Sequence, residues 1–222
     1  MITLKSLYNL FAQHKEGAWV LKPESAKALY DFVKKHDVKS VLELGTGIGL
    51  SAAIIALALK EKGVKEYKID TVEQFEKCTE LAKKLIPAEL QTGVSFHKID
   101  PALWETKNVP GQHFANFSHL PDGKYDLIIV DGPGPYLQDG ALIENPNGDV
   151  LRLHQEGKIA PGSFVYFDGR LNALGVIERF YGHNFWILDD AKIRANVIER
   201  KDNPVEMKDV RKEFYIKTGY FA

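Results

Sequence analysis

The sequence predicts an α/β fold, a three-layer sandwich in which helices cover both faces of a mostly parallel central sheet. Short runs rich in β-branched and aromatic residues alternate along the chain with longer stretches whose apolar residues recur at helical spacing. One such run passes through a glycine-rich turn directly into an alanine-rich helical stretch. The chain has 222 residues, 45% of them hydrophobic, which is enough for one sizeable core. We therefore expect one domain over residues 1–222, with a helical N-terminal extension over about residues 1–37.

The expected elements follow the change between these two patterns. Tyr125–Val130 is continuously apolar after Asp126, as in a central strand that is buried on both faces. The other expected strands are Ser40–Leu44, Tyr67–Val72, Val94–Ile99, Ser163–Phe167, Phe185–Leu188 and the closing strand Glu213–Tyr220, the expected helices are Ser25–Lys35, Ser51–Lys60, Gln74–Leu85 and Leu171–Tyr181, and Val197–Arg200 fits either type.

Two stretches between these elements are expected to be long loops. Pro101–Gly123 contains prolines, glycines and histidines, and Gly132–Asp149 is rich in Gly, Pro and Asn. Loops of this length in a compact domain are usually functional or mobile, so either of them could close over a site.

The composition limits the class of partner and the compartment. A formal net charge of −1 gives no electrostatic reason to expect a nucleic acid or an anionic membrane as partner. The single cysteine, Cys78, excludes a disulfide within the chain and a cysteine metal cluster. Leu50–Leu59 is the most apolar stretch and is too short to span a bilayer, which needs about 20 residues. We expect a cytoplasmic protein that acts on a small molecule, and the sequence leaves a homodimer open.

The turn after Ser40–Leu44 is the most informative part of the chain. Gly45, Gly47 and Gly49 alternate with other residues before a helix begins. Glycine allows a positive φ and a close approach of the backbone to a ligand, and the free N–H groups of a helix start favour an anionic group. A dinucleotide-binding turn would have a third glycine where Leu50 stands, which disfavours a nicotinamide dehydrogenase.

The run E-x-G-x-G-x-G from Glu43 to Gly49 resembles the cofactor signature of class I S-adenosylmethionine-dependent methyltransferases, which have a Rossmann-like fold. The continuation Gly49-Leu50-Ser51-Ala52 resembles a segment of the small-molecule O-methyltransferases of the catechol type. The resemblance implies that Glu43 engages the cofactor's amino group, directly or through water. It also implies that the turn binds the methionine part of S-adenosylmethionine through Gly45, Thr46, Gly47, Gly49 and Ser51.

Acidic residues at the next two strand ends extend this expected cofactor site. Glu73 ends the second strand roughly 20 residues beyond the glycine turn, where an acid accepts hydrogen bonds from ribose hydroxyls. Asp70 is a weaker alternative for that role. Asp100 ends the third strand, and the resemblance implies that it reaches the amino group of adenine.

Two further acids are expected on the substrate side of the cofactor. Asp131 and Asp168 each follow a predicted parallel strand, so their carboxylates should converge at the same edge of the sheet. Methyl transfer to oxygen needs alignment of donor and acceptor and removal of the acceptor's proton, which a carboxylate or a histidine such as His154 can accept. Further polar or aromatic candidates for the pocket are His113, Arg170, Tyr136 and Trp19.

The same two acids raise the question of a metal. In the catechol-type family, the positions of Asp131 and Asp168 hold a divalent cation, so the resemblance implies Mg²⁺ here. An asparagine of that family is replaced by Gly169, and its lysine is replaced by Gly134. These departures leave a metal-free mechanism open, although two carboxylates can hold Mg²⁺ together with water.

The acceptor is expected to be a small hydroxylated molecule. The run Asp131-Gly-Pro-x-x-Tyr136 is similar to small methyltransferases that act on sugar hydroxyls, which favours a carbohydrate. Two alternatives remain: another transferase on the same scaffold, such as an aminopropyltransferase, and a non-catalytic module that binds S-adenosylmethionine.

Overall fold

The computed structural model describes residues 2–17, 20–105, 113–168, 170, 172–175, 185–190 and 195–200. The helices are α1 (Leu4–Ala12), α2 (Pro23–Lys35), α3 (Leu50–Glu61), α4 (Glu76–Leu85), the 3₁₀ turn η2 (Ala88–Leu90) and α5 (Asp149–Gln155). The strands are β1 (Ser40–Leu44), β2 (Lys68–Glu73), β3 (Val94–Lys98), β4 (Pro101–Glu105), β5 (His113–Phe117), β6 (Tyr125–Val130), β7 (Tyr136–Gln138), β8 (Ala141–Ile143), β9 (Ile159–Asp168), β10 (Phe185–Asp190) and β11 (Ala195–Arg200).

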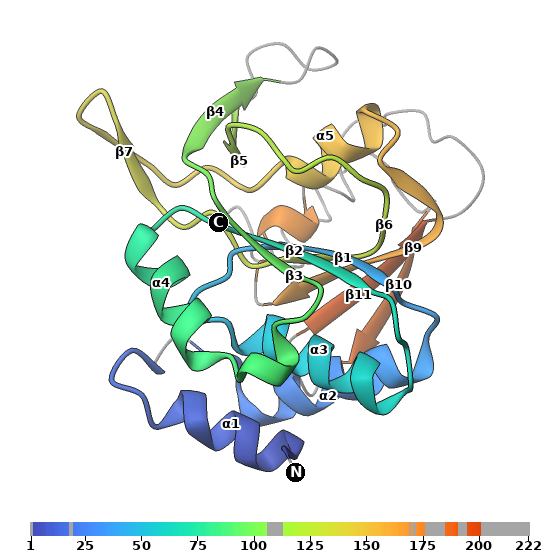
Figure 1. The fold of residues 1–222 in the computed structure, drawn as a ribbon. Helices are drawn as coiled ribbons and strands as arrows, with labels where there is room; N and C mark the ends of the chain where they lie inside the picture. The colour runs from blue at the N-terminus through green and yellow to red at the C-terminus, as the bar shows by residue number, and fades with distance from the viewer. Residues whose placement is uncertain are drawn as a thin grey trace.

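A seven-stranded sheet with the order β10-β11-β9-β6-β1-β2-β3 forms the centre of the fold (Figure 1). Five neighbouring strands of this sheet are parallel, namely β3, β2, β1, β6 and β9. Strand β11 is antiparallel to both of its neighbours, β9 and β10. The chain moves outward from β1 through β2 to β3 and then returns to place β6 on the other side of β1. This reversal makes the carboxyl ends of β1 and β6 the place where an open α/β sheet binds its ligand. The predicted mostly parallel sheet is confirmed.

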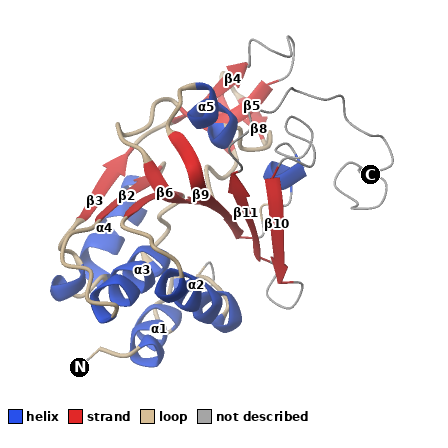
Figure 2. Cartoon of the chain, turned by 90° about the vertical axis from the view of Figure 1, so that its right-hand side faces the viewer, coloured by secondary structure: helices blue, strands red, loops and turns tan. Residues whose placement is uncertain are grey.

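Alternate side chains of the central strands supply two apolar clusters, one on each face of the sheet. Val41 and Leu127 pack with α1, α2 and α3, whereas Leu42 and Ile128 pack with α5 and β5. Figure 2 shows the three long helices below the sheet and α5 with the smaller strands above it. The predicted three-layer sandwich is therefore observed, and helices α1 and α2 precede β1 in the chain. Among the described helices, none is long and apolar enough to cross a membrane.

The prediction of two long loops is wrong for the parts of these segments that the structure describes. Pro101–Gly123 contains the antiparallel pair β4 and β5, and Gly132–Asp149 contains the antiparallel pair β7 and β8. The prolines and glycines mark turns between short strands, and strands of three to five residues are too short to show a clear period. Helix α5 was also missed. Of the predicted helix Leu171–Tyr181, residues 172–175 are described and helical, and the predicted strand Glu213–Tyr220 lies outside the described residues.

Candidate active site

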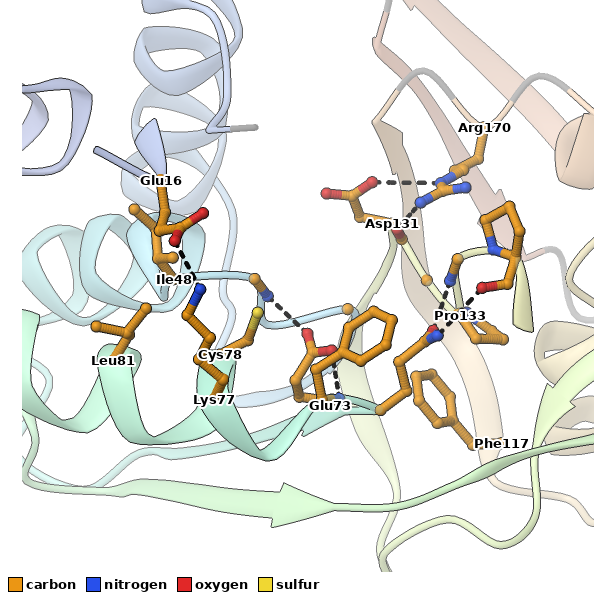
Figure 3. A pocket seen from close by; sticks show the side chains of 17 residues that line it. Glu16, Ile48, Glu73, Lys77, Cys78, Leu81, Phe117, Asp131, Pro133 and Arg170 are labelled. Atoms are coloured by element: carbon orange, nitrogen blue, oxygen red, sulfur yellow. Dashed lines mark hydrogen bonds and ion pairs between the residues drawn. The ribbon is translucent and has the colours of Figure 1, made fainter. Parts of the chain in front are cut away.

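A cavity of about 590 Å³ lies at the carboxyl ends of β1, β2 and β6, at the point where the strand order reverses. Its walls come from the glycine turn, the junction of β2 and α4, the segment Asp131–Pro135 after β6, and the side chains of Glu16 and Arg170 (Figure 3). This volume lies within the range of about 300–1,000 Å³ that is usual for small-molecule sites.

The glycine turn is fixed by backbone contacts to both neighbouring strands. The N–H groups of Gly45 and Thr46 donate to the carbonyl of Val72 at 2.9 and 3.1 Å. Gly45 has a φ of +102°, and a Cβ atom there would lie 2.7 Å from the backbone of Asp131. Gly47 has a φ of +52° and lines the cavity, with no protein atom within 4 Å of where its Cβ would be. Glycine at these two positions lets the turn approach the next loop while leaving room for a ligand.

Glu73 connects the end of β2 to the glycine turn. One carboxylate oxygen accepts the N–H of Gly47 at 2.9 Å, and the other accepts the N–H of Phe75 at 2.9 Å. The side chain lines the cavity although only 6% of the residue is exposed, and burial raises the pKa of the carboxyl group against these hydrogen bonds. The carboxylate therefore lies at the cavity wall among backbone N–H groups of the turn and of the segment after β2.

Glu43 lies beneath the turn and does not line the cavity. It is fully buried and accepts hydrogen bonds from the hydroxyls of Ser51 and Thr71, and Thr46 also contacts Thr71. Burial raises the pKa of the Glu43 carboxyl group to about 7, against the effect of the two hydroxyls. Of this predicted group, Glu43, Thr46 and Ser51 therefore form a polar network that supports the turn from below.

Gly49 and Asp100 also lie away from the cavity wall. Gly49 precedes α3, and a Cβ atom there would be 2.9 Å from Ala82 and 3.0 Å from Ile86, so this glycine lets the turn pack on α4. The side chain of Asp100 is 75% exposed and pairs with Lys98. Asp70, the weaker alternative to Glu73, is buried and bonded by His97 and Tyr125.

Asp131 follows β6, and its carboxylate meets an arginine in the cavity. The Nε atom of Arg170 donates to Oδ1 of Asp131 at 3.3 Å, and Nη2 donates to the Asp131 backbone carbonyl. Both side chains are about one-third exposed. The backbone N–H of Asp131 donates to Leu44 at 2.8 Å, which holds this residue beside the glycine turn. The structure thus brings Asp131, Arg170, Gly45, Gly47 and Glu73 around one cavity.

None of the remaining catalytic and pocket candidates has a described side chain in the cavity wall. Asp168 ends β9, the neighbour of β6, but its side chain lies outside the described part of the chain. His154 is half-buried on α5 and does not line the cavity, and neither does the exposed His113. Tyr136 begins β7, and burial raises the pKa of its phenol. Trp19 lies outside the described residues.

Sequence reasoning missed several residues of the cavity wall. Gln74 accepts the N–H of Gly134 at 2.7 Å, which ties the β2 end to the loop after β6. Phe75 is 55% exposed and also lines the cavity, as does the ion pair between Lys77 and Glu16 at 2.7 Å. The position of Gln74 and Phe75 directly after Glu73 is a signal that could have found them. Glu16 comes from a distant segment, and its sequence gives no such signal.

Comparisons with known proteins show similarity to one enzyme family. A family model described as O-methyltransferase matches residues 1–134. A curated protein of Mycobacterium sp. (strain JLS), provisionally named an O-methyltransferase, is 23% identical over 139 residues. That match spans 61% of this chain and 57% of the relative, so the chain matches little more than half of the relative's length.

Two solved structures share the fold over most of both chains. The SAH-bound Podospora anserina methyltransferase PaMTH1 has a TM-score of 0.59 and 14% identity, covering 90% of this chain and 88% of that chain. The Bacillus cereus O-methyltransferase in complex with SAH has a TM-score of 0.56 and 14% identity, covering 89% and 90%. At this identity the likeness shows the fold.

Proposed function

The chain belongs to the O-methyltransferase family, and from this premise we propose that it transfers a methyl group from S-adenosylmethionine to an oxygen of a small hydroxylated molecule. One observation carries the proposal: the glycine turn and the Glu73 carboxylate face the same cavity at the switch point of the sheet. The SAH in the two similar structures supports the choice of cofactor.

The chain's residues fit the two ends of this cofactor. The open space at Gly47 and the backbone of Gly45 leave room for the methionine part of the cofactor. The buried Glu43 network holds the turn in place and so acts on this part only indirectly. Glu73 presents its carboxylate at the cavity wall, where ribose hydroxyls can donate to it, and the exposed ring of Phe75 offers an apolar face beside it. The role of Asp100 at adenine stays a prediction, because its carboxylate pairs with Lys98 outside the cavity wall.

The chemistry combines a proton transfer with a methyl transfer. The acceptor oxygen loses its proton and bonds the methyl carbon, while the carbon–sulfur bond of the sulfonium breaks and leaves a neutral thioether. The protein's part is to hold the acceptor in line with the methyl group and to accept the proton. Of the carboxylates in the cavity wall, Glu16 pairs with Lys77 and Glu73 accepts backbone N–H groups, so we assign this role to the third, Asp131. Asp168 and His154 remain candidates for assisting it.

The residues around Asp131 do not fit the predicted Mg²⁺. The guanidinium of Arg170 already lies on the carboxylate, and a divalent cation there would face this positive charge. Gly169 and Gly134 offer no side-chain donor. Within the described residues, no group of three or more acidic, histidine or cysteine side chains is arranged to hold a metal ion. We therefore assign no step to a metal.

The acceptor class rests on the cavity and on one sequence motif. The loop Gly132–Pro135, which directly follows Asp131, and Phe117 contribute apolar surface to the cavity wall. The Asp131-Gly-Pro-x-x-Tyr136 run supports a sugar-like acceptor as the finer form of the proposal. The single cysteine suits a reducing compartment such as the cytoplasm, and a homodimer is left open.

Calorimetry and turnover together test the proposal. We expect S-adenosylmethionine and SAH to bind the purified chain, and NAD to bind at least 100-fold more weakly. A panel of phenols, sugars and hydroxy acids should then yield SAH with at least one acceptor. Tight NAD binding without a response to the methyl donor would overturn the cofactor assignment. Cofactor binding without SAH formation on any acceptor would favour the non-catalytic module.

A further inference from the structure

Arg170 places a positive charge at the acceptor end of the cavity. Arg170 lies just beyond β9 and Asp131 just beyond the adjacent parallel strand β6, so the sheet itself brings the two side chains together. Both residues line the cavity (Figure 3). The guanidinium is thus held by the fold in the region where the chemistry of Asp131 takes place.

The contacts with Asp131 use only part of the guanidinium. Nε donates to the carboxylate at 3.3 Å, and one hydrogen of Nη2 goes to the backbone carbonyl. A guanidinium carries five N–H donors in one plane. The end-on edge, formed by Nη1 and the second hydrogen of Nη2, is not needed for these two contacts. This edge has the fork geometry that binds two oxygens of a carboxylate.

The other charged groups of the described cavity wall have closer partners. Lys77 pairs with Glu16 at 2.7 Å, and the Glu73 carboxylate accepts two backbone N–H groups at 2.9 Å. The pair between Arg170 and Asp131 is longer and uses a single carboxylate oxygen. Arg170 is therefore the cation of this wall that is best able to bind an incoming anion.

We propose that Arg170 binds an anionic oxygen of the methyl acceptor, so that the acceptor is a small hydroxylated molecule that also carries a carboxylate or an ionised phenolic oxygen. This inference rests on the proposed function and narrows its substrate class. The guanidinium orients the acceptor, and it favours the ionised form of a bound oxygen through its charge.

Binding of matched probes tests the proposal without requiring turnover. The pair 3-hydroxybenzoate and 3-hydroxybenzamide differs in charge but hardly in shape, and glucuronate with glucose repeats the comparison on a sugar. Phenol at a pH above its pKa tests an ionised phenolic oxygen alone. Each probe is titrated calorimetrically into the protein with and without SAH. We expect an anionic probe to bind about 10- to 100-fold more tightly than its neutral partner, as a charge-assisted hydrogen bond allows.

Variants of Arg170 identify the source of this preference. Arg170→Gln should abolish it, and Arg170→Lys should keep a reduced preference because a charge remains without the planar fork. Lys27→Gln removes an exposed cation on α2 and should change nothing. Thermal unfolding of each variant confirms that the chain is folded. If the hydroxybenzoate pair of probes shows the preference, the acceptor is aromatic, and if the glucuronate pair shows it, the acceptor is a sugar.

The possible failures are distinguishable. Equal binding of charged and neutral probes, or a preference that survives in folded Arg170→Gln, overturns the role of Arg170 while SAH binding still supports the proposed function. An Arg170-dependent preference in a chain that binds neither SAH nor S-adenosylmethionine supports the anion site and overturns the methyltransferase instead.

Discussion

The carboxylate of Glu73 accepts the backbone N–H of Gly47 at 2.9 Å, and this contact joins the end of β2 to the glycine turn after β1. The same carboxylate is tied to Phe75 at the start of α4. One side chain therefore fixes both walls of the cavity on this side before any ligand is bound. A ligand that bonds Glu73 and touches Gly47 meets a site whose geometry is already set, which lowers the ordering cost of binding.

Replacing Gly47 tests whether the turn holds the cofactor. Gly47→Val should lower the affinity for SAH by at least 100-fold, because the side chain enters the open space beside the turn. Folding should lose about 1–3 kcal/mol, the cost of a positive φ in a residue with a Cβ atom. Calorimetry and thermal unfolding measure the two effects.

Gly63→Val is the matched control for this change. Gly63 has a φ of +82° and also has no atom within 4 Å of its Cβ position, but it does not line the cavity. It should lose similar stability and keep full affinity for SAH. Unchanged affinity in a folded Gly47→Val chain would contradict the proposed binding mode.

Asp131→Asn tests the proton acceptor. The amide keeps the size of the side chain but cannot take the proton, so turnover should fall by roughly 100- to 10,000-fold, the usual contribution of general base catalysis. The affinity for SAH should change by less than about threefold, because the glycine turn and Glu73 are left in place. Steady-state kinetics and calorimetry provide the two values. Full retention of turnover would remove Asp131 from the reaction, and exposed Asp122→Asn serves as the control.

The sequence was sufficient to predict the parallel strands of the central sheet and part of the site, whereas Val197–Arg200, which fitted either type, lies in the antiparallel strand β11. β6 matches the predicted Tyr125–Val130 because a strand buried on both faces is apolar throughout, and β1 matches Ser40–Leu44. The glycine turn and Glu73 could be found because backbone geometry and the position after a strand both depend on local sequence. These parts of the cavity need no knowledge of distant contacts.

The rest of the site depends on tertiary contacts that no local pattern shows. Glu43 and Glu73 are both acids at the end of a strand, yet Glu43 points beneath the turn to Ser51 and Thr71, and Glu73 lines the cavity. The hydroxyls of neighbouring elements decide whether such a carboxylate turns beneath the turn or into the cavity. Arg170 likewise gains its role from Asp131, a residue far away in the chain.

The pH dependence of stability should report the buried Glu43. Burial raises the pKa of this carboxyl group from 4.5 to about 7 in the folded chain. The folded state therefore binds the proton more tightly than the unfolded state, so its contribution to stability is present below pH 4.5 and is lost as the pH rises through 7. Relative to Glu43→Gln, which cannot ionise, the wild-type free energy of unfolding should fall by about 2–3 kcal/mol from pH 5 to pH 8.

Urea unfolding of both chains at several pH values measures this difference. Glu66→Gln changes an exposed acid and should follow the wild-type pH dependence. A constant difference between wild type and Glu43→Gln over this range would show that Glu43 is equally protonated in the folded and unfolded chain, or that the network binds it as a carboxylate.

Asp149 should be a main determinant of stability on the face of the sheet that α5 covers, opposite helices α1, α2 and α3. Its carboxylate is fully buried and bonds Arg152 at 2.7 Å, the N–H of Phe117 at 3.1 Å and the amide of Asn147 at 2.9 Å. Asp149→Ala leaves the buried guanidinium of Arg152 without its partner, which costs about 3–5 kcal/mol. The measurement is the free energy of unfolding in urea, with Asp122→Ala as the control, because Asp122 pairs with Lys158 at the surface, where such a pair contributes about 0–1 kcal/mol. Equal losses of unfolding free energy in Asp149→Ala and Asp122→Ala would mean that the buried pair adds nothing beyond a surface pair.

The same change should also reach the cavity, because Asn147 donates both to Asp149 and to the carbonyl of Gly132 at 2.9 Å. The Asp149→Ala protein that remains folded should therefore bind the acceptor more weakly.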